Sequence, residues 1–315
     1  MDTTGTIFLT PGGSTIAGEV DSLFYFLVYA SIAMFGIVLA GLVYFGLRYR
    51  RRQTDADTPT SGRAHNLKLE LLWSIIPTIL VVIVFIWGFR IYIKMHVVPH
   101  EAMEVKVTGQ KWFWSFDYPQ GASTVNELVV PVSKPIKLLM SSKDVIHSFF
   151  VPDFRIKMDV LPNRYTITWF EATRTGNFDL FCAEFCGDGH SDMIGKVRVV
   201  GEREFSEWLE AGLSGGEGMT PEDFGARLYV SKACNTCHSI DGRSLVGPTF
   251  KGAFGTRRVL EDGGEVTIDE NYIRESILEP QAKVSAGFQP VMPTYQGLLN
   301  SREIDALVVY IKSLK

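Results

Sequence analysis

Cys182-Ala-Glu-Phe-Cys186-Gly-Asp-Gly-His190-Ser-Asp-Met193 is the stretch that decides the organisation of this chain. It holds two thiols, an imidazole, a thioether and carboxylates close together in sequence. Sulfur ligands combined with imidazole suit copper better than they suit hard cations, which prefer oxygen. A further histidine, His147, lies upstream in Asp144-Val-Ile-His147-Ser-Phe-Phe-Val. Two cysteines, two histidines and one methionine are the ligands that two copper ions sharing bridging thiolates would need.

Other sites could use some of the same residues. A single-copper electron-transfer site takes one cysteine, two histidines and a weak axial methionine, so one of the two cysteines would be surplus. A tetrahedral zinc site with two cysteines and two histidines is the structural alternative on the ligands alone. Disulfides are the simplest interpretation of paired cysteines in an exported protein. A short loop that adds His and Met to the cysteine pair favours a metal site.

The remaining two cysteines form a separate signal, Cys234-Asn-Thr-Cys237-His238. This spacing predicts covalent haem attachment through the thiols, with the histidine as an axial iron ligand. Met292 is the only methionine after His238, and methionine ligation opposite histidine is typical of electron-transfer cytochromes. A thioredoxin-like Cys-x-x-Cys or a zinc knuckle is the alternative, but neither explains the adjoining histidine.

Two apolar segments precede these sites. No charged residue occurs from Leu23 to Leu47 or from Leu71 to Phe89, and about 20 apolar residues span a bilayer. The connecting loop begins Arg48-Tyr-Arg-Arg-Arg52 and adds Arg63 and Lys68. Because positive short loops stay in the cytoplasm, both chain termini are predicted to be extracytoplasmic. Residues 1–20 lack the basic start and apolar core of a cleavable signal.

The sequence predicts a multi-domain chain. The net charge of −4 gives no argument for nucleic-acid binding. Short alternating runs such as Glu104–Thr108, punctuated by Pro and Gly, predict an all-β domain, and capped amphipathic segments after residue 219 predict an all-α domain. The predicted divisions are an N-terminal tail (1–20), a transmembrane hairpin (21–96, spans 23–47 and 71–93), a β-domain (97–211), a Gly-rich linker (212–219) and a helical domain (220–315).

Several of these segments together resemble a known family. The two spans, Gln110-Lys-Trp112-Phe-Trp114-Ser-Phe-Asp-Tyr118, the His147 segment and the Cys182–Met193 loop are similar to subunit II of haem–copper cytochrome c oxidases. The haem-binding segment over residues 220–315 resembles class I cytochromes c, a fusion typical of the caa-type branch. The resemblance implies a cupredoxin-like β-domain that carries the dinuclear centre called CuA.

The resemblance also implies roles for individual residues. The implied copper ligands are His147, Cys182, Glu184 through its backbone carbonyl, Cys186, His190 and Met193. The implied haem c residues are Cys234 and Cys237 for covalent attachment and His238 and Met292 as axial ligands. The Glu184 side chain would face a Mg or Mn ion shared with subunit I. Trp112 would be the electron-entry residue, whereas Trp114 is interpreted as a core aromatic. Glu70, which by position alone is an interfacial acid at a helix N-terminus, would lie at a proton-channel entrance.

The implied activity is that of a proton-translocating cytochrome c oxidase in a bacterial plasma membrane. Electrons would come from a soluble cytochrome c or a quinol-oxidising complex, and the partners would be oxidase subunits I and III. The two spans hold no histidine, so no catalytic residue is assigned and O2 reduction is expected in a partner subunit. The alternative functions are a membrane-anchored copper-delivery or thiol-redox assembly protein and a nitrogen-oxide reductase module with the same copper pair. The second span and Met193 argue against the assembly protein.

Overall fold

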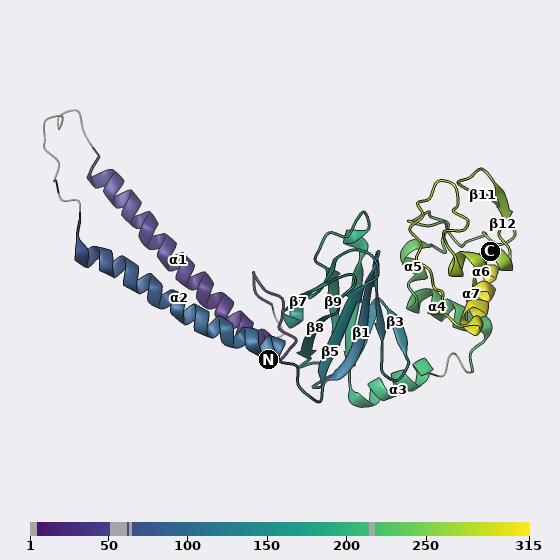
Figure 1. The fold of residues 1–315 in the computed structure, drawn as a ribbon, viewed down its shortest axis with the longest axis horizontal. Coiled ribbons are helices and arrows are strands. Elements are labelled where there is room, and N and C mark those ends of the chain that lie inside the picture. The colour runs from purple at the N-terminus through teal and green to yellow at the C-terminus, as the bar shows by residue number, and fades with distance from the viewer. Residues whose placement is uncertain (1–4, 51–61, 63–64, 214–217) are drawn as a thin grey trace. The chain divides into compact units, whose positions relative to one another are not determined.

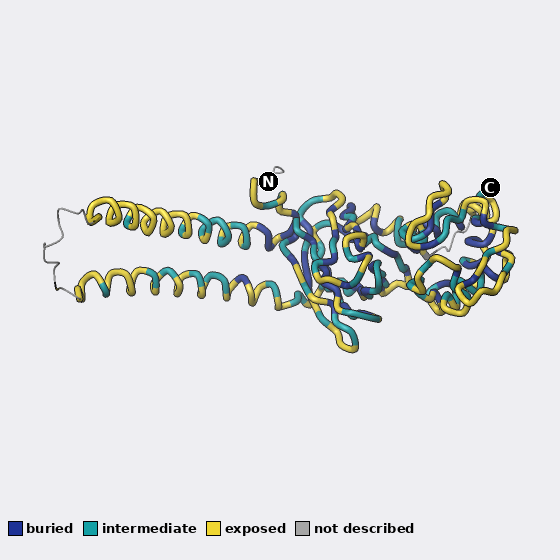
Figure 2. The backbone as a smooth tube through the Cα atoms, turned by 90° about the horizontal axis from the view of Figure 1, so that it is seen from above, coloured by how far each residue is buried: buried dark blue, intermediate teal, exposed yellow. Residues whose placement is uncertain are grey.

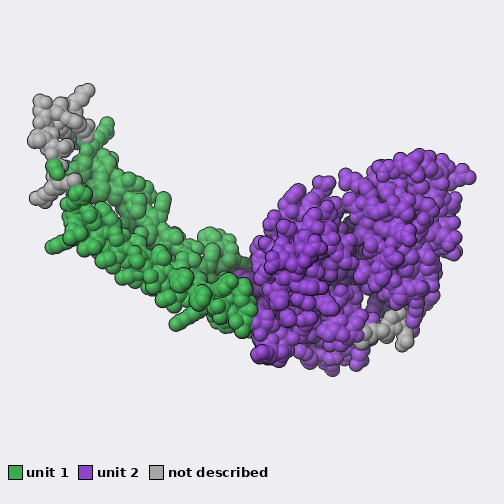
Figure 3. Space-filling view, in the orientation of Figure 1, with its two compact units in different colours: residues 1–97 green, residues 98–315 purple. Residues whose placement is uncertain are grey.

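The computed structural model describes residues 5–50, 62, 65–213 and 218–315. The chain divides into two compact units, residues 1–97 and residues 98–315 (Figure 3). Parts of three predicted segments lie outside the described residues: 1–4 of the tail, 214–217 of the linker and, in the basic loop, Arg51, Arg52 and Arg63.

The first unit is built from two long helices, α1 (Ala17–Arg48) and α2 (Leu67–His96). Both are long and apolar enough to cross a membrane, and their apolar side chains are exposed along most of their length (Figure 2). Each helix extends beyond the charge-free run that predicted it. The added turns contain Arg48, Lys68 and Lys94, which lie near the helix ends, where a membrane span tolerates charged residues. Pro77 lies inside α2.

The β-domain in the second unit is a sandwich of two five-stranded sheets (Figure 1). The first sheet has the order β3-β2-β1-β5-β8, with bounds Ser123–Val125, Phe113–Asp117, Met103–Gln110, Pro135–Ser142 and Thr166–Glu171. The second sheet has the order β4-β10-β9-β6-β7, with bounds Glu127–Pro131, Ile194–Val200, Gly176–Cys182, His147–Val151 and Ile156–Val160.

The alternation of buried and partly exposed residues along the strands explains how the two sheets form one core. In β5 every second residue is buried, so Ile136, Leu138 and Met140 face inward. Trp114 is fully buried and packs edge-on against Phe149 of the opposite sheet, as the prediction of a core aromatic requires. Helix α3 (Glu202–Leu213) follows β10, and its Trp208 packs against Tyr118. The fold is therefore the predicted all-β cupredoxin-like sandwich.

The helical domain has its own hydrophobic core. Its helices are α4 (Pro221–Ser231), α5 (Cys234–Cys237), α6 (Glu270–Leu278) and α7 (Ser301–Ser313). Thr220 caps α4 and Asp269 caps α6, each by accepting a hydrogen bond from a backbone N–H. Asn300 forms a capping box with Glu303 at the start of α7.

Two details of this domain were not predicted. A short hairpin, β11 (Arg257–Val259) and β12 (Glu265–Thr267), interrupts the otherwise helical fold. Gly263, at φ +82°, supplies the left-handed conformation in its turn. Helices α4 and α7 cross at Gly225, where an added Cβ would be 2.1 Å from the carbonyl oxygen of Ala306. Only glycine allows the two backbones to approach so closely.

Candidate metal centre and haem cavity

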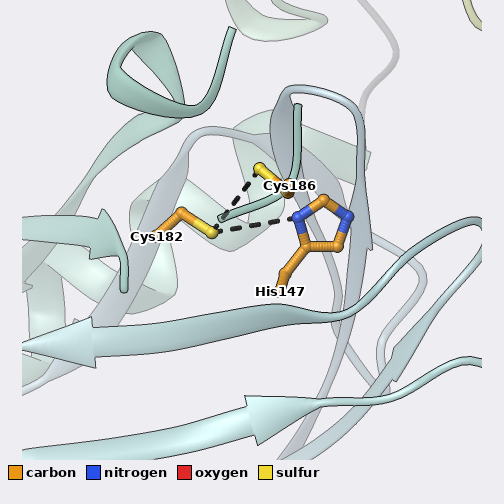
Figure 4. A group of neighbouring side chains, drawn as sticks. All are labelled: His147, Cys182 and Cys186. Atoms are coloured by element: carbon orange, nitrogen blue, oxygen red, sulfur yellow. Dashed lines mark hydrogen bonds between the residues drawn. The ribbon is translucent and has the colours of Figure 1, made fainter. Parts of the chain in front are cut away.

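The sheet containing β6, β9 and β10 positions the sulfur and imidazole groups. His147 is the first residue of β6, Cys182 is the last residue of β9, and the two strands pair antiparallel. The loop from Ala183 to Met193 then joins β9 to β10 and carries the other side chains. In Figure 4 the Cys182 sulfur faces both the Cys186 sulfur and the His147 ring. The ligand atoms of these three buried residues all lie within 4.8 Å of one another.

The distances divide the candidate ligands into two halves. Cys182 Sγ lies 3.9 Å from His147 Nδ1 and 3.3 Å from the Glu184 carbonyl oxygen. Cys186 Sγ lies 3.5 Å from His190 Nδ1 and 3.9 Å from Met193 Sδ. The two sulfurs are 3.8 Å apart. Two ligand atoms bound to one ion at about 2.0–2.3 Å in tetrahedral geometry are about 3.5 Å apart, so these spacings fit metal coordination.

The two thiols differ in their tendency to ionise. Burial by itself raises the pKa of Cys182, but hydrogen bonds with His147 and with the backbone at Glu184 and Ser148 outweigh it and lower the pKa to about 6. Burial and the adjacent charge of Cys182 raise the pKa of Cys186 to about 12. One thiolate therefore forms readily, whereas the second requires a compensating positive charge. A cation between the sulfurs would supply that charge, which is what the donor set of a metal site implies.

The His147 imidazole is held by a carboxylate that the sequence did not single out. Its Nε2 is 2.8 Å from Asp144 Oδ1, and the side chain is fully buried. Although burial alone raises the pKa of Asp144, hydrogen bonds from His147, Lys111 and Val145 lower it below its usual value. Metal-binding histidines commonly donate their second ring N–H to a carboxylate. The sequence signal for this contact was the presence of an acid three residues before a candidate ligand.

Trp112 lies beside the cysteine loop. Its indole Nε1 donates a hydrogen bond to the carbonyl oxygen of Cys186 at 3.2 Å. An added Cβ at Gly187 would be 3.3 Å from the indole, and at Gly189 it would be 2.4 Å from it. The ring therefore packs directly on the backbone of the loop. The two glycines were also missed, because their role depends on a contact with Trp112, which lies in the turn between β1 and β2 and is distant in sequence.

Glu184 is exposed, whereas Glu70 is half-buried. The Glu184 side chain is exposed while its carbonyl oxygen faces the Cys182 sulfur. Glu70 lies in the first turn of α2, where its Oε1 accepts a hydrogen bond from Asn66 N at 3.0 Å. His65 Nδ1 is 3.6 Å from the same carboxylate. Glu70 thus caps its own helix, as an acid at a helix N-terminus is expected to do.

The second predicted set of ligands surrounds an apolar cavity in the helical domain. The cavity has a volume of about 1430 Å³ with its open mouth included. Cys234, Cys237, His238 and Met292 all line it, together with apolar side chains such as Leu307. Burial raises the pKa of Cys234 to about 12 and also raises the pKa of Cys237, so both thiols are neutral. An apolar cavity lined by two thiols, an imidazole and a thioether fits a covalently attached haem.

His238 is oriented for a ligand role. Its Nδ1 is 2.8 Å from the carbonyl oxygen of Pro248, so Nδ1–H donates to that oxygen and Nε2 keeps a free lone pair. Phe250 stacks on the ring at a centroid distance of 4.4 Å. An added Cβ at Gly247 would be 2.6 Å from the ring, so glycine is required there. Burial lowers the pKa of His238, which keeps the imidazole neutral for coordination.

The haem cavity and the β-domain meet within the second unit. Lys111, Trp112 and Phe113 of the β-domain are among the residues that line the cavity. Phe113 also forms a small buried cluster with Val125 and Ala233, the residue immediately before Cys234. The structure therefore brings Trp112 close to both predicted ligand sets.

Comparison with known proteins gives the same three-part order. The chain matches the family descriptions "Cytochrome C oxidase subunit II, transmembrane domain" over residues 2–91, "Cytochrome C oxidase subunit II, periplasmic domain" over residues 120–200 and "Cytochrome c" over residues 223–315.

Individual proteins are similar to most of the chain or to part of it. Cytochrome c oxidase subunit 2 of Alkalihalophilus pseudofirmus is 30% identical over 294 residues, which cover 90% of this chain and 81% of that protein. The alternative cytochrome c oxidase subunit 2 of Bradyrhizobium diazoefficiens is 31% identical and covers 63% of this chain and 83% of its own length. The crystal structure of the periplasmic domain of subunit II of cytochrome oxidase from Bradyrhizobium japonicum is 36% identical, with a TM-score of 0.37, and covers 38% of this chain and 98% of that one.

Proposed function

The chain belongs to the cytochrome c oxidase subunit II family, and from this premise we propose that it relays electrons from a haem c through a dinuclear copper centre to subunit I. It is a membrane-anchored subunit of a haem–copper oxidase and carries a fused cytochrome c domain. The copper and haem imply single-electron chemistry when bound. O2 reduction belongs to the haem–copper site of the partner subunit.

The division of the ligands into two halves is the observation that carries the proposal. A single tetrahedral ion would require all four Cys and His ligand atoms to be mutually close. His147, Cys182 and Cys186 form such a group, but His190 lies outside it although its Nδ1 is 3.5 Å from Cys186 Sγ. Two ions sharing the cysteines satisfy both halves. His147 and the Glu184 carbonyl would serve one ion, and His190 and Met193 the other.

The residues of the helical domain would hold haem c. Cys234 and Cys237 would form the covalent links, and His238 and Met292 would be the axial ligands. His238 is suited to this role because its Nδ1–H donates to the Pro248 carbonyl and leaves Nε2 free. The surrounding apolar side chains exclude water from the cavity, which favours a high reduction potential.

Trp112 would receive the electron from the haem domain. Its indole donates to the Cys186 carbonyl, and the residue also lines the haem cavity, so it lies between the two ligand sets. The proposed role of the Trp112 side chain is therefore to place a rigid aromatic group between the copper ligands and the haem ligands and to exclude water from that space. Trp114, which is fully buried, serves the core.

Further roles follow from the family. The exposed Glu184 carboxylate would bind a Mg or Mn ion shared with subunit I. Glu70 would admit protons to a channel in that subunit, in addition to capping α2. Subunit III would complete the assembly, and the electron donor would be a soluble cytochrome c or a quinol-oxidising complex. Both redox domains and both termini would lie on the extracytoplasmic side of a bacterial plasma membrane.

Metal analysis and electron paramagnetic resonance of the purified oxidase test the proposal. We expect two copper ions and one covalent haem per chain, with the hyperfine pattern of one electron shared equally by two copper nuclei. Cys186→Ser should abolish that pattern while leaving the covalent haem in place, because the haem ligands lie in a different domain. Recovery of a single zinc ion without copper would reject the proposal, as would a single-copper spectrum.

A further inference from the structure

The Asp144 carboxylate lies between a copper ligand and the turn that carries Trp112. Its Oδ1 is 2.8 Å from His147 Nε2 and accepts the N–H of Val145 at 2.7 Å. Its Oδ2 accepts the backbone N–H of Lys111 at 2.8 Å. Lys111 immediately precedes Trp112. Both oxygens of one side chain are therefore committed, each to a different part of the site.

The first of these contacts fixes the imidazole. Donation from Nε2–H to a carboxylate leaves the lone pair on Nδ1, the nitrogen that faces the Cys182 sulfur. The ring has no room to turn, because it is fully buried and an added Cβ at Gly109 would be only 3.0 Å from its Cδ2. Asp144 thus selects the tautomer and the orientation in which His147 can bind metal.

The second contact fixes the backbone of the tryptophan. At the other end of the same residue, the indole Nε1–H donates to the Cys186 carbonyl. The Trp112 side chain is therefore attached to the cysteine loop through its ring and to the His147 ligand through Asp144. The Asp144 carboxylate thus contacts both the His147 ring and the backbone next to Trp112.

We propose that Asp144 is a positioning residue that sets the geometry of Trp112 relative to the copper ligand His147. The proposal rests on the proposed function, because it takes Trp112 as the point of electron entry. It assigns to one carboxylate two tasks that are separable in experiment: orienting a ligand and seating the group that delivers the electron. Loss of either task leaves a distinct signature.

Asp144→Asn separates the two tasks. An asparagine of the same size presents one carbonyl oxygen and one NH2 group, so it can accept from His147 or from Lys111 but not from both. Bound copper favours the orientation in which the oxygen still faces His147. The NH2 group of the asparagine then faces the Lys111 N–H. Because both groups are donors, the hydrogen bond to Lys111 is lost. Asp144→Ala removes both contacts and gives the reference for complete loss.

The measurements are made on the intact oxidase. Hydrogen exchange reports the Lys111 amide, electron paramagnetic resonance reports the copper pair, and rapid mixing reports electron transfer from haem c to copper. For Asp144→Asn we expect the copper spectrum to persist, the Lys111 amide to exchange about tenfold faster or more, and electron transfer to slow. For Asp144→Ala the copper spectrum should change as well. Glu104→Gln is the matched control, because Glu104 pairs with Lys137 and touches neither branch.

The outcomes distinguish this proposal from the one it rests on. If Asp144→Asn leaves both the Lys111 exchange and the copper spectrum unchanged, Asp144 is not a positioning residue. Trp112→Phe tests the underlying assumption separately. If that variant transfers electrons at the normal rate while Asp144→Asn still frees the Lys111 amide, the electron-entry role of Trp112 is wrong and the positioning of the turn by Asp144 stands.

Discussion

The two thiols of the proposed copper site, Cys182 and Cys186, are close neighbours with opposite electrostatic surroundings. Hydrogen bonds from His147 and the backbone favour the Cys182 thiolate, whereas the charge of that thiolate and burial keep Cys186 protonated. The metal-free site is therefore a thiolate–thiol pair, and metal binding must displace the remaining proton. The number of protons released when metal binds therefore reports how many of the two thiols were protonated before binding.

Copper loading should release one thiol proton per chain near pH 9 and two below pH 6. Between about 6 and 12 only Cys186 still holds its proton; below about 6 Cys182 is protonated too, so acid weakens copper binding. As the pH is lowered, the apparent affinity for copper should fall about tenfold per pH unit above about pH 6 and about a hundredfold per pH unit below it. His147, whose pKa is raised, adds its own proton as the pH falls.

The proton release can be measured by titrating copper into the metal-free chain in buffers of different ionisation enthalpy. Cys186→Ser is the control, because it removes the thiol that should supply the proton at pH 9. Release of two thiol protons at pH 9 would contradict the assignment of a low pKa to Cys182.

Gly189→Ala should disturb electron entry without removing a ligand. The Gly189 backbone, at φ −87°, suits alanine, but the added methyl would be 2.4 Å from the Trp112 ring. Such overpacking costs about 1–3 kcal/mol and is relieved by displacing the indole. We expect slower electron transfer from haem c with copper content unchanged, measured by rapid mixing. Gly201→Ala adds a methyl with nothing within 4 Å and is the control; equal rates in both variants would show that the ring is not displaced.

At the scale of elements, the sequence was informative where a strand has one buried face. The run Glu104–Thr108, which predicted a strand, lies within β1, and the buried residues of this strand alternate. β6 was not identified as a strand because Ser148 and Phe149 are buried on both faces and no alternation results. The Cys, His and Met ligand candidates could be named from spacing. Asp144 lies only three residues before His147, but its second contact, with the backbone N–H of Lys111, joins segments that are distant in sequence and could not be predicted.

The crossing of α4 and α7 should depend on Gly225. A Cβ at this position meets the backbone carbonyl of Ala306, which cannot move aside as a side chain would, so Gly225→Ala must separate the helices. We expect a loss of about 1–3 kcal/mol or more in the stability of the cytochrome domain, measured as a lower urea midpoint of the haem absorbance. Val230→Ala on the exposed side of α4 is the control. Equal midpoints would mean that the crossing tolerates a wider spacing.

On the scale of the whole molecule, the arginines between the helices predict the side of the membrane. Arg48 and Arg50 follow the first span, and further basic residues precede the second, so this loop is expected to stay in the cytoplasm. Alkaline phosphatase fused after Lys315 should be active, and a fluorescent protein inserted between residues 51 and 61 should fluoresce. The reverse pattern would place the redox domains in the cytoplasm. A catalytically dead phosphatase fusion controls for expression.

The helical domain has a hydrophobic core of its own, separate from that of the sandwich, although both belong to one chain. A donor that is permanently tethered meets its acceptor at an effective concentration set by the tether, of the order of millimolar for short flexible connections. The encounter between these two domains then becomes unimolecular. We expect its rate to be independent of how much free cytochrome the cell makes, and nearly insensitive to ionic strength, since no long-range steering of a diffusing partner is needed. Under the proposed electron relay, the salt-dependent, second-order step would instead be the reaction between the tethered haem and the molecule that reduces it.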